Sequence, residues 1–98
     1  MSPNNKKKLL ILRKKLDKVD EKLLNILKIR SNYVREVLLL KEFKNEIIDR
    51  KRIKLILGNV RKKSIKKGID TKISNKIWKS MIYAFIDYEF RNFKKKRN

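Results

Sequence analysis

The sequence predicts an all-α protein built from three helices, one very long and two shorter. Apolar residues recur at steps of three and four along three stretches of the chain, which is the period of an α-helix. No stretch alternates apolar and polar residues as a strand does, and no internal repeat is present. The 98 residues, of which 41% are apolar, are enough for one folded domain. We therefore expect a single domain over residues 1–98, with loose tails at about residues 1–5 and 95–98.

The first helix is expected to run from about Lys6 to about Lys44, a stretch without Pro or Gly. At 1.5 Å per residue it would be more than about 50 Å long, whereas a small domain is only about 30 Å wide. Two short helices of the same chain cannot cover an apolar stripe of that length, so we expect a second chain to cover it. The stripe comprises Leu9, Leu12, Leu16, Val19, Leu23, Ile26, Leu27, Tyr33, Val34, Val37 and Leu40.

A turn is expected over residues 45–48, followed by a second helix that runs to about Lys67. Asp49 suits the N-cap because its carboxylate can accept from the first backbone N–H groups. Gly68 suits the left-handed position just beyond a helix, whereas Gly58 weakens the helix interior by about 1 kcal/mol relative to Ala. The inner face is expected to consist of Ile53, Ile56, Leu57 and Val60.

The third helix is expected to run to about Lys94, with either Asp70 or Ser74 as its N-cap. Its apolar side chains recur at helical spacing and include most of the aromatic residues of the chain, so we expect them in the core or in a dimer contact. They are Ile73, Ile77, Trp78, Met81, Ile82, Phe85, Ile86, Phe90 and Phe93.

The chain is strongly basic, with 30 Lys and Arg against 10 Asp and Glu and a formal net charge of +20. Such an excess is typical of proteins that bind nucleic acid. A codon bias explains it equally well, because Lys, Ile and Asn are all abundant and all have AT-rich codons. Under either interpretation the protein attracts anionic ligands.

The chain contains no cysteine and no histidine. This composition excludes disulfides, thiol nucleophiles, imidazole bases and Cys/His metal sites. Arg13 interrupts the first apolar run too early for the core of a signal peptide, and no run is long enough to span a membrane. We expect a cytoplasmic protein without a membrane partner.

Three cations mark the predicted long helix near its start, past its middle and at its end: Arg13, Arg30 and Lys41. Arg13 and Arg30 are 17 residues apart, about 25 Å along a helix, so one chain cannot hold a small molecule with both. Arg30 and Lys41 are 11 residues apart, which puts them on nearly the same face about 16 Å from each other. A second, antiparallel copy would bring its own Arg13 into that space and form a composite site. Taken singly, each cation is more simply explained as a solvated surface residue.

The segment VDEKLL, residues 19–24, lies between Arg13 and Arg30. In order and spacing, residues 12–41 resemble the long first helix of the all-helical chorismate mutases, and the resemblance covers about residues 9–93. It implies an intertwined homodimer that converts chorismate to prephenate in phenylalanine and tyrosine biosynthesis, with no metal or cofactor. It further implies that Arg30 and the second chain's Arg13 bind the substrate carboxylates, and that Lys41 donates to the ether oxygen.

The resemblance assigns roles to the two shorter helices as well. Arg50 matches an arginine that shapes the substrate site, and Phe85 is expected to pack against the wall of that site. Glu89 stands where many relatives have a glutamine that donates to the ether oxygen. A carboxylate donates only when it is protonated, so Glu89 either carries a proton in the complex or forms an ion pair with a cation such as Lys41. Lys51 departs from the family, in which a glutamate there accepts from a substrate hydroxyl.

Other functions remain open. The same fold supports isochorismate pyruvate lyases, which form salicylate and pyruvate, and the short turn after Lys41, the cation at Lys51 and the bulky Phe85 favour that alternative. Glu89 and Arg50 favour the mutase, which we prefer. A regulatory domain that binds an aromatic ligand without catalysis is a further possibility. A basic helical nucleic-acid-binding protein is the more remote alternative, because no helix-turn-helix or zinc-finger pattern is present.

Overall fold

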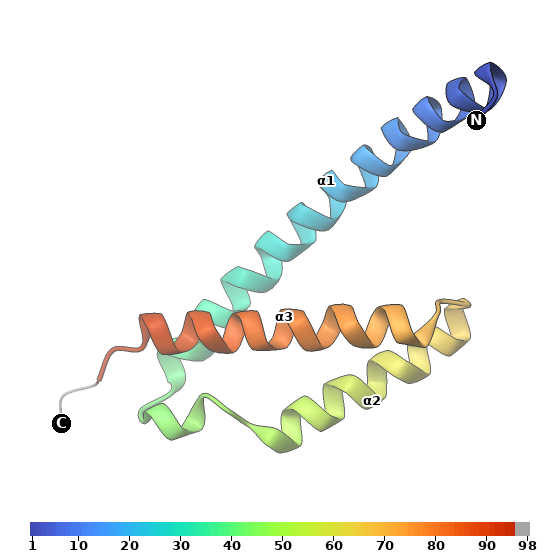
Figure 1. Ribbon diagram of the computed structural model, residues 1–98. Helices are drawn as coiled ribbons and strands as arrows, with labels where there is room; N and C mark the ends of the chain where they lie inside the picture. The colour runs from blue at the N-terminus through green and yellow to red at the C-terminus, as the bar shows by residue number, and fades with distance from the viewer. Residues whose placement is uncertain (96–98) are drawn as a thin grey trace. The chain divides into compact units, whose positions relative to one another are not determined.

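The computed structural model describes residues 1–95, in which the long helix α1 spans Pro3–Leu40. A short 3₁₀ helix, η1 (Lys44–Glu46), follows it. Two further helices, α2 (Arg50–Lys67) and α3 (Thr71–Asn92), complete the fold (Figure 1). No strand occurs within residues 1–95, so the predicted all-α class with one long and two shorter helices is confirmed. None of these helices is long and apolar enough to cross a membrane.

The chain divides into two compact units, Met1–Tyr33 and a second unit that begins at Val34. The first unit is a single helical segment, so it has no core of its own. Its large apolar side chains are exposed, most of them by more than half of their surface. Nothing within the first unit can cover this stripe. The exposed large apolar residues from residue 10 to the end of this unit are Leu10, Ile11, Leu12, Leu16, Val19, Leu23, Leu24, Ile26, Leu27, Ile29 and Tyr33.

The first helix begins three residues earlier than the sequence period predicts, at Pro3 instead of Lys6. The backbone N–H of Asn5 donates to Oγ of Ser2 over 3.2 Å, so Ser2 acts as the N-cap. Proline is well suited to the first helical position, where its missing N–H would have no partner within the helix. The loose tail expected over residues 1–5 is therefore wrong beyond its first two residues.

The first helix also ends earlier than expected, at Leu40 instead of near Lys44. The carboxylate of Glu46 explains the early end. It accepts from the backbone N–H groups of Glu42 over 2.7 Å and Phe43 over 3.3 Å. These two N–H groups therefore do not donate to the carbonyls four residues earlier, as they would in a helix, and the turn starts directly after Leu40.

The ends of α2 and α3 follow the predicted local signals. Asp49 caps α2 by accepting from the backbone N–H three residues on over 3.0 Å. Gly68 has a positive φ of 70° and closes α2 in the left-handed conformation that favours glycine. Asp70, not Ser74, caps α3, because its carboxylate accepts from two N–H groups of the first turn over 2.8 and 3.4 Å. The helix ends at Asn92, two residues before the expected end.

Two small residues meet near the turn between α2 and α3, which run antiparallel side by side in the second unit (Figure 1). The hydroxyl oxygens of Ser64 and Ser74 are 2.8 Å apart, and each residue is only 4% exposed. The hydroxyl of Ser64 also donates to the carbonyl of Val60 over 2.7 Å. Two short side chains with mutually satisfied hydroxyls thus allow the helices to approach closely.

The inner faces of the two helices differ in how well the sequence predicts them. On α3 the most buried residues are Ser74, Ile82 and Glu89, whose spacing of eight and seven places them on one face. Ile73 and Ile77 belong to the same apolar set but are 57% and 53% exposed, because they lie on an adjoining face. The predicted inner face of α2 is confirmed as half-buried: Ile53, Ile56, Leu57 and Val60.

Replacing Ser74 by Leu is expected to destabilise the protein by about 1–3 kcal/mol, because the contact with Ser64 leaves no room for a larger side chain. The matched control is Lys76→Leu on the exposed side of the same helix, which should change the free energy of unfolding by no more than about 0.5 kcal/mol. Urea denaturation followed by circular dichroism measures both. Equal stability of the two variants would contradict the close packing of α2 and α3.

Candidate functional site

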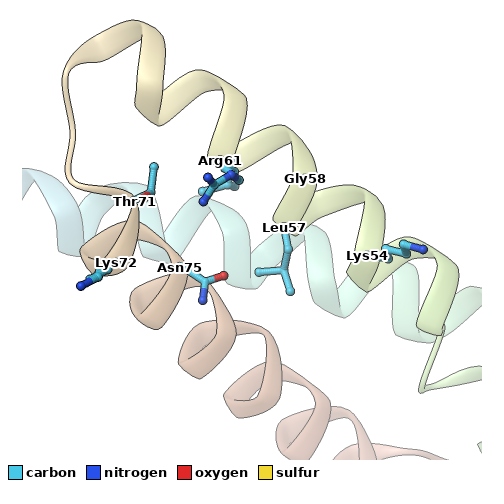
Figure 2. A pocket seen from close by; sticks show the side chains of 8 residues that line it. Lys54, Leu57, Gly58, Arg61, Thr71, Lys72 and Asn75 are labelled. Atoms are coloured by element: carbon cyan, nitrogen blue, oxygen red, sulfur yellow. The ribbon is translucent and has the colours of Figure 1, made fainter.

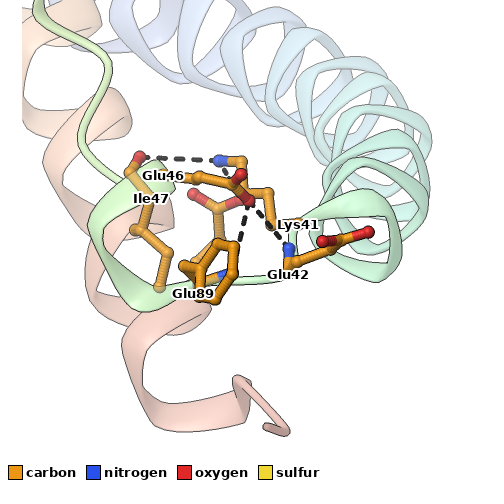
Figure 3. Close-up of polar contacts among 6 residues, drawn as sticks. Lys41, Glu42, Glu46, Ile47 and Glu89 are labelled. Atoms are coloured by element: carbon orange, nitrogen blue, oxygen red, sulfur yellow. Dashed lines mark hydrogen bonds and ion pairs between the residues drawn. The ribbon is translucent and has the colours of Figure 1, made fainter. Parts of the chain in front are cut away.

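The centre of the candidate site is an ion pair between the end of α1 and the last part of α3. Nζ of Lys41 donates to Oε1 of Glu89 over 3.0 Å (Figure 3). The side chain of Lys41 is 18% exposed and that of Glu89 only 8%. The sequence left an ion pair with Lys41 as one of two alternatives for Glu89, and this is the arrangement in the unliganded chain.

The ammonium of Lys41 has a second protein partner. Its Nζ lies 3.5 Å from the carbonyl oxygen of Ile47, a residue that is 3% exposed (Figure 3). An ammonium carries three donors, and the contacts of Lys41 within residues 1–95 use two of them. The remaining donor can serve an anionic or ether oxygen that enters the site, so Lys41 is fixed in place and still able to bind.

Glu46 holds the backbone that follows Lys41. Its two bonds to the N–H groups of Glu42 and Phe43 close the bend through which the chain leaves α1 (Figure 3). Because Ile47 follows directly, the same bend presents the carbonyl that Lys41 contacts. The sequence analysis missed Glu46, although an acidic residue three positions after a helix N-cap is a known capping signal.

A second group of contacts missed by the sequence analysis flanks Glu89. Nε of Arg35, near the end of α1, donates to the phenolic oxygen of Tyr88 over 3.2 Å. The guanidinium of Arg91 lies 5.9 Å from the centre of the Tyr88 ring and pairs with Asp87 over 2.8 Å. Tyr88, which precedes Glu89 in the chain, therefore contacts two cations. The exposed pair between Arg91 and Asp87 adds little stability.

Arg50 and Phe85 are the other predicted site residues of the second unit, and Lys51 is the position at which the chain departs from the family. Phe85 is half-buried one turn before Glu89 on α3. Arg50 and Lys51 form the exposed beginning of α2, and no salt bridge involves either one within residues 1–95. The side chains of Arg50 and Lys51 are thus exposed at the start of α2.

Arg13 and Arg30 belong to the first unit. Arg13 is exposed and Arg30 is half-buried. Their approach to Lys41 and Glu89 stays a prediction. Within residues 1–95, no cluster of three or more Asp, Glu, His or Cys side chains could hold a metal ion.

Replacing Glu46 by Ala is expected to loosen the bend after Lys41, because two backbone N–H groups lose their acceptor. The loss of such a cap costs about 0.5–2 kcal/mol. Amide hydrogen exchange at Glu42 and Phe43 should accelerate in the variant, since exchange reports local opening. Glu42→Ala removes a carboxylate from the same bend without removing the acceptor, and it serves as the control. Unchanged exchange in Glu46→Ala would contradict the role of this carboxylate.

Comparison with known proteins gives one match. The family described as Chorismate mutase type II matches residues 12–90, which is most of the chain. No curated protein and no solved structure matches it significantly. The matched stretch contains Arg13 and Arg30 on α1, Lys41 directly after that helix, and Glu89 on α3. The chain therefore belongs to the chorismate mutase type II family.

Proposed function

We propose that the protein is a chorismate mutase, which rearranges chorismate to prephenate in the cytoplasm as a step in phenylalanine and tyrosine biosynthesis. The observation that carries the proposal is the position of Lys41. Its ammonium is held by Glu89 and by the carbonyl of Ile47 in a largely buried setting, within a chain that belongs to this family. A fixed cation of this kind is what the rearrangement requires at its centre.

In the rearrangement, one carbon–carbon bond forms while the carbon–oxygen bond of the enolpyruvyl ether breaks. All bonding changes occur within the substrate, so the protein contributes position and charge. Holding the two reacting carbons close together lowers the entropic part of the barrier. Lys41 would donate to the ether oxygen, on which negative charge develops, and an already fixed donor stabilises that charge without reorganisation.

Glu89 has two successive tasks in this proposal. In the unliganded protein it accepts from Lys41 and holds the ammonium in place. When the substrate is bound, a protonated Glu89 would donate to the ether oxygen together with Lys41, because only the protonated carboxyl group has a donor. The burial of this side chain supports the second task, because a hydrogen bond to the ether oxygen is stronger where water is excluded.

The two substrate carboxylates would bind Arg30 and, from the second chain, Arg13. Guanidinium groups suit this task because they bind carboxylates through two parallel hydrogen bonds. Arg50 would complete the cationic wall from the start of α2, and Phe85 would pack against the carbon skeleton. The separation of Arg13 from Arg30 along α1 is the reason that the proposal requires two chains.

A homodimer is therefore part of the proposed function. The uncovered apolar stripe of the first unit supports it, as do the exposed Ile73 and Ile77 on α3. Within residues 1–95, the buried apolar residues are limited to Leu38, Ile47 and Ile82. Soluble monomers rarely expose so much contiguous apolar surface, and a second copy offers an identical stripe to pair with it.

Isochorismate pyruvate lyase activity is the second candidate. Lys51 favours it, because this exposed cation stands where a mutase would use an acceptor for a substrate hydroxyl. Purified protein supplied separately with chorismate and with isochorismate distinguishes the two activities. We expect chorismate to be consumed and prephenate to appear. Turnover of isochorismate alone, with release of pyruvate, would overturn the mutase proposal.

Lys41 should be tested in a background that tolerates its loss, because removing it alone leaves the buried Glu89 without its ion-pair partner. Glu89→Gln should keep turnover, since the amide oxygen accepts from Lys41 and the amide N–H donates to the ether. Adding Lys41→Met should then lower kcat by about a hundred- to a thousandfold, the scale of losing one oxyanion donor. Lys44→Met is the matched control. Equal rates in Glu89→Gln with and without Lys41→Met would remove Lys41 from the site.

A composite site across two chains makes a specific prediction for mixed dimers. In the Glu89→Gln background, Arg13→Ala and Lys41→Met should each be inactive alone. After the two variants are mixed, unfolded and refolded together, one of the two sites in each mixed dimer regains both cations. About a quarter of the rate of Glu89→Gln should return, because half of the dimers are mixed and half of their sites are intact. No recovery in a mixture shown to contain mixed dimers would contradict the composite site.

A further inference from the structure

A cavity lies between α2 and the start of α3, away from Lys41 and Glu89. Its volume is about 420 Å³. Lys54, Leu57 and Arg61 of α2 and Thr71, Lys72 and Asn75 of α3 line it, together with Gly58 and Val60 (Figure 2). Along α3, Asn75 and Glu89 are separated by 14 residues, or about 21 Å. The cavity is therefore distinct from the candidate mutase site.

The lining of this cavity is positively charged. Lys54, Arg61 and Lys72 supply three cations, and no acidic residue contributes to the lining. The surrounding sequence is similar, because residues 50–86 contain twelve Lys and Arg and one acidic residue, Asp70. The carboxylate of Asp70 is engaged in capping α3. Within residues 1–95, none of these twelve cations takes part in a salt bridge.

Carboxylates are unevenly distributed along the chain. The rest of the chain contains 18 Lys and Arg and nine acidic residues, so acidic residues are common outside residues 50–86 and nearly absent within them. Residues 1–16 and 90–98 also lack carboxylates. What ties positive charge to this cavity is therefore that three cations line it and no carboxylate does.

Gly58 is a second and independent feature of the cavity. It lies inside α2, where glycine destabilises a helix relative to alanine. Its φ is not positive, and a Cβ atom added to it would meet nothing within 4 Å. Neither the backbone nor the packing of the chain thus requires glycine here. Its visible effect is to leave the wall of the cavity open beside Leu57.

We propose that this cavity binds a nucleoside phosphate. The phosphates would pair with Arg61 and Lys72, and the flat base would lie over the apolar surface at Leu57 beside Gly58, on the side toward Lys54. Figure 2 shows the side chains of Leu57 and Asn75 pointing into the space between the two helices.

The polar residues of the cavity complete the match. The amide of Asn75 offers a donor and an acceptor together, which matches the edge of a purine base, and Thr71 adds a hydroxyl. The volume falls within the range of about 300–1,000 Å³ that is typical of small-molecule sites. The inference does not depend on the proposed mutase activity.

The test is isothermal titration calorimetry of the full chain at physiological salt with three probes: ATP, inorganic triphosphate and adenosine. ATP should bind at least about tenfold more tightly than either of its parts, because both ends of the cavity then contribute. Equal affinity for ATP and triphosphate would show that charge alone is recognised and would overturn the proposal. Absence of ATP binding would overturn it as well.

Two variants and a matched control locate the binding site. Arg61→Ala should weaken ATP binding about tenfold or more, the scale of losing a charge-assisted contact, whereas Lys62→Ala on the same helix should leave it unchanged. Gly58→Leu should abolish binding by filling the cavity and should raise the melting temperature, since Leu favours a helix. Loss of binding in Gly58→Leu therefore cannot result from unfolding.

The alternative occupant is a nucleic acid held by the basic surface as a whole. In that case a single-stranded oligonucleotide would bind more tightly than ATP, and Arg61→Ala and Lys62→Ala would weaken it equally, because phosphate contacts are spread along the surface. That result would overturn the nucleotide proposal. Unchanged ATP binding in Gly58→Leu would do so as well.

Discussion

The ion pair between Lys41 and Glu89 is the interaction on which both the second unit and the candidate site depend. The two residues are 48 positions apart, and their contact ties the end of α1 to the last turns of α3. Withdrawing both charges from water costs free energy that one contact recovers only in part. Two apolar side chains would hold the same helices together at lower cost. The retention of charge at this position is therefore better explained by chemistry than by stability.

The α2–α3 pair was predictable because its signals act over short distances. Asp49 and Asp70 accept hydrogen bonds from backbone N–H groups two or three residues away, and Gly68 adopts the positive φ that ends α2. The ends of α1 were harder to predict. Ser2 and Pro3 lie before the apolar period begins, and the final turn is decided by a carboxylate in the following bend. The apolar period thus predicts where a helix packs better than where it stops.

The candidate site was predictable only in part. Lys41 and Glu89 stood out through the family resemblance, and the sequence allowed their pairing without requiring it. The contact between Arg35 and Tyr88 could not be predicted from the sequence, because the two residues are 53 positions apart. The apolar period shows which face of a helix is buried, but it does not show which residues of two helices lie opposite each other. The predicted meeting of Arg13 and Arg30 involves a second chain, so neither the sequence nor the protomer tests it.

The nine Lys and Arg of α2 are unaccompanied by any acidic residue within that helix. Three of them, Arg50, Lys51 and Arg52, occupy its first turn, where the positive end of the helix dipole already lies. Repulsion among such exposed charges weakens as dissolved ions screen it, with a screening length of about 10 Å at 0.1 M salt. A protein held together by surface ion pairs loses stability when salt is added, whereas this helix should gain it. Dissolved salt should therefore stabilise the folded protein by screening the repulsion among these cations.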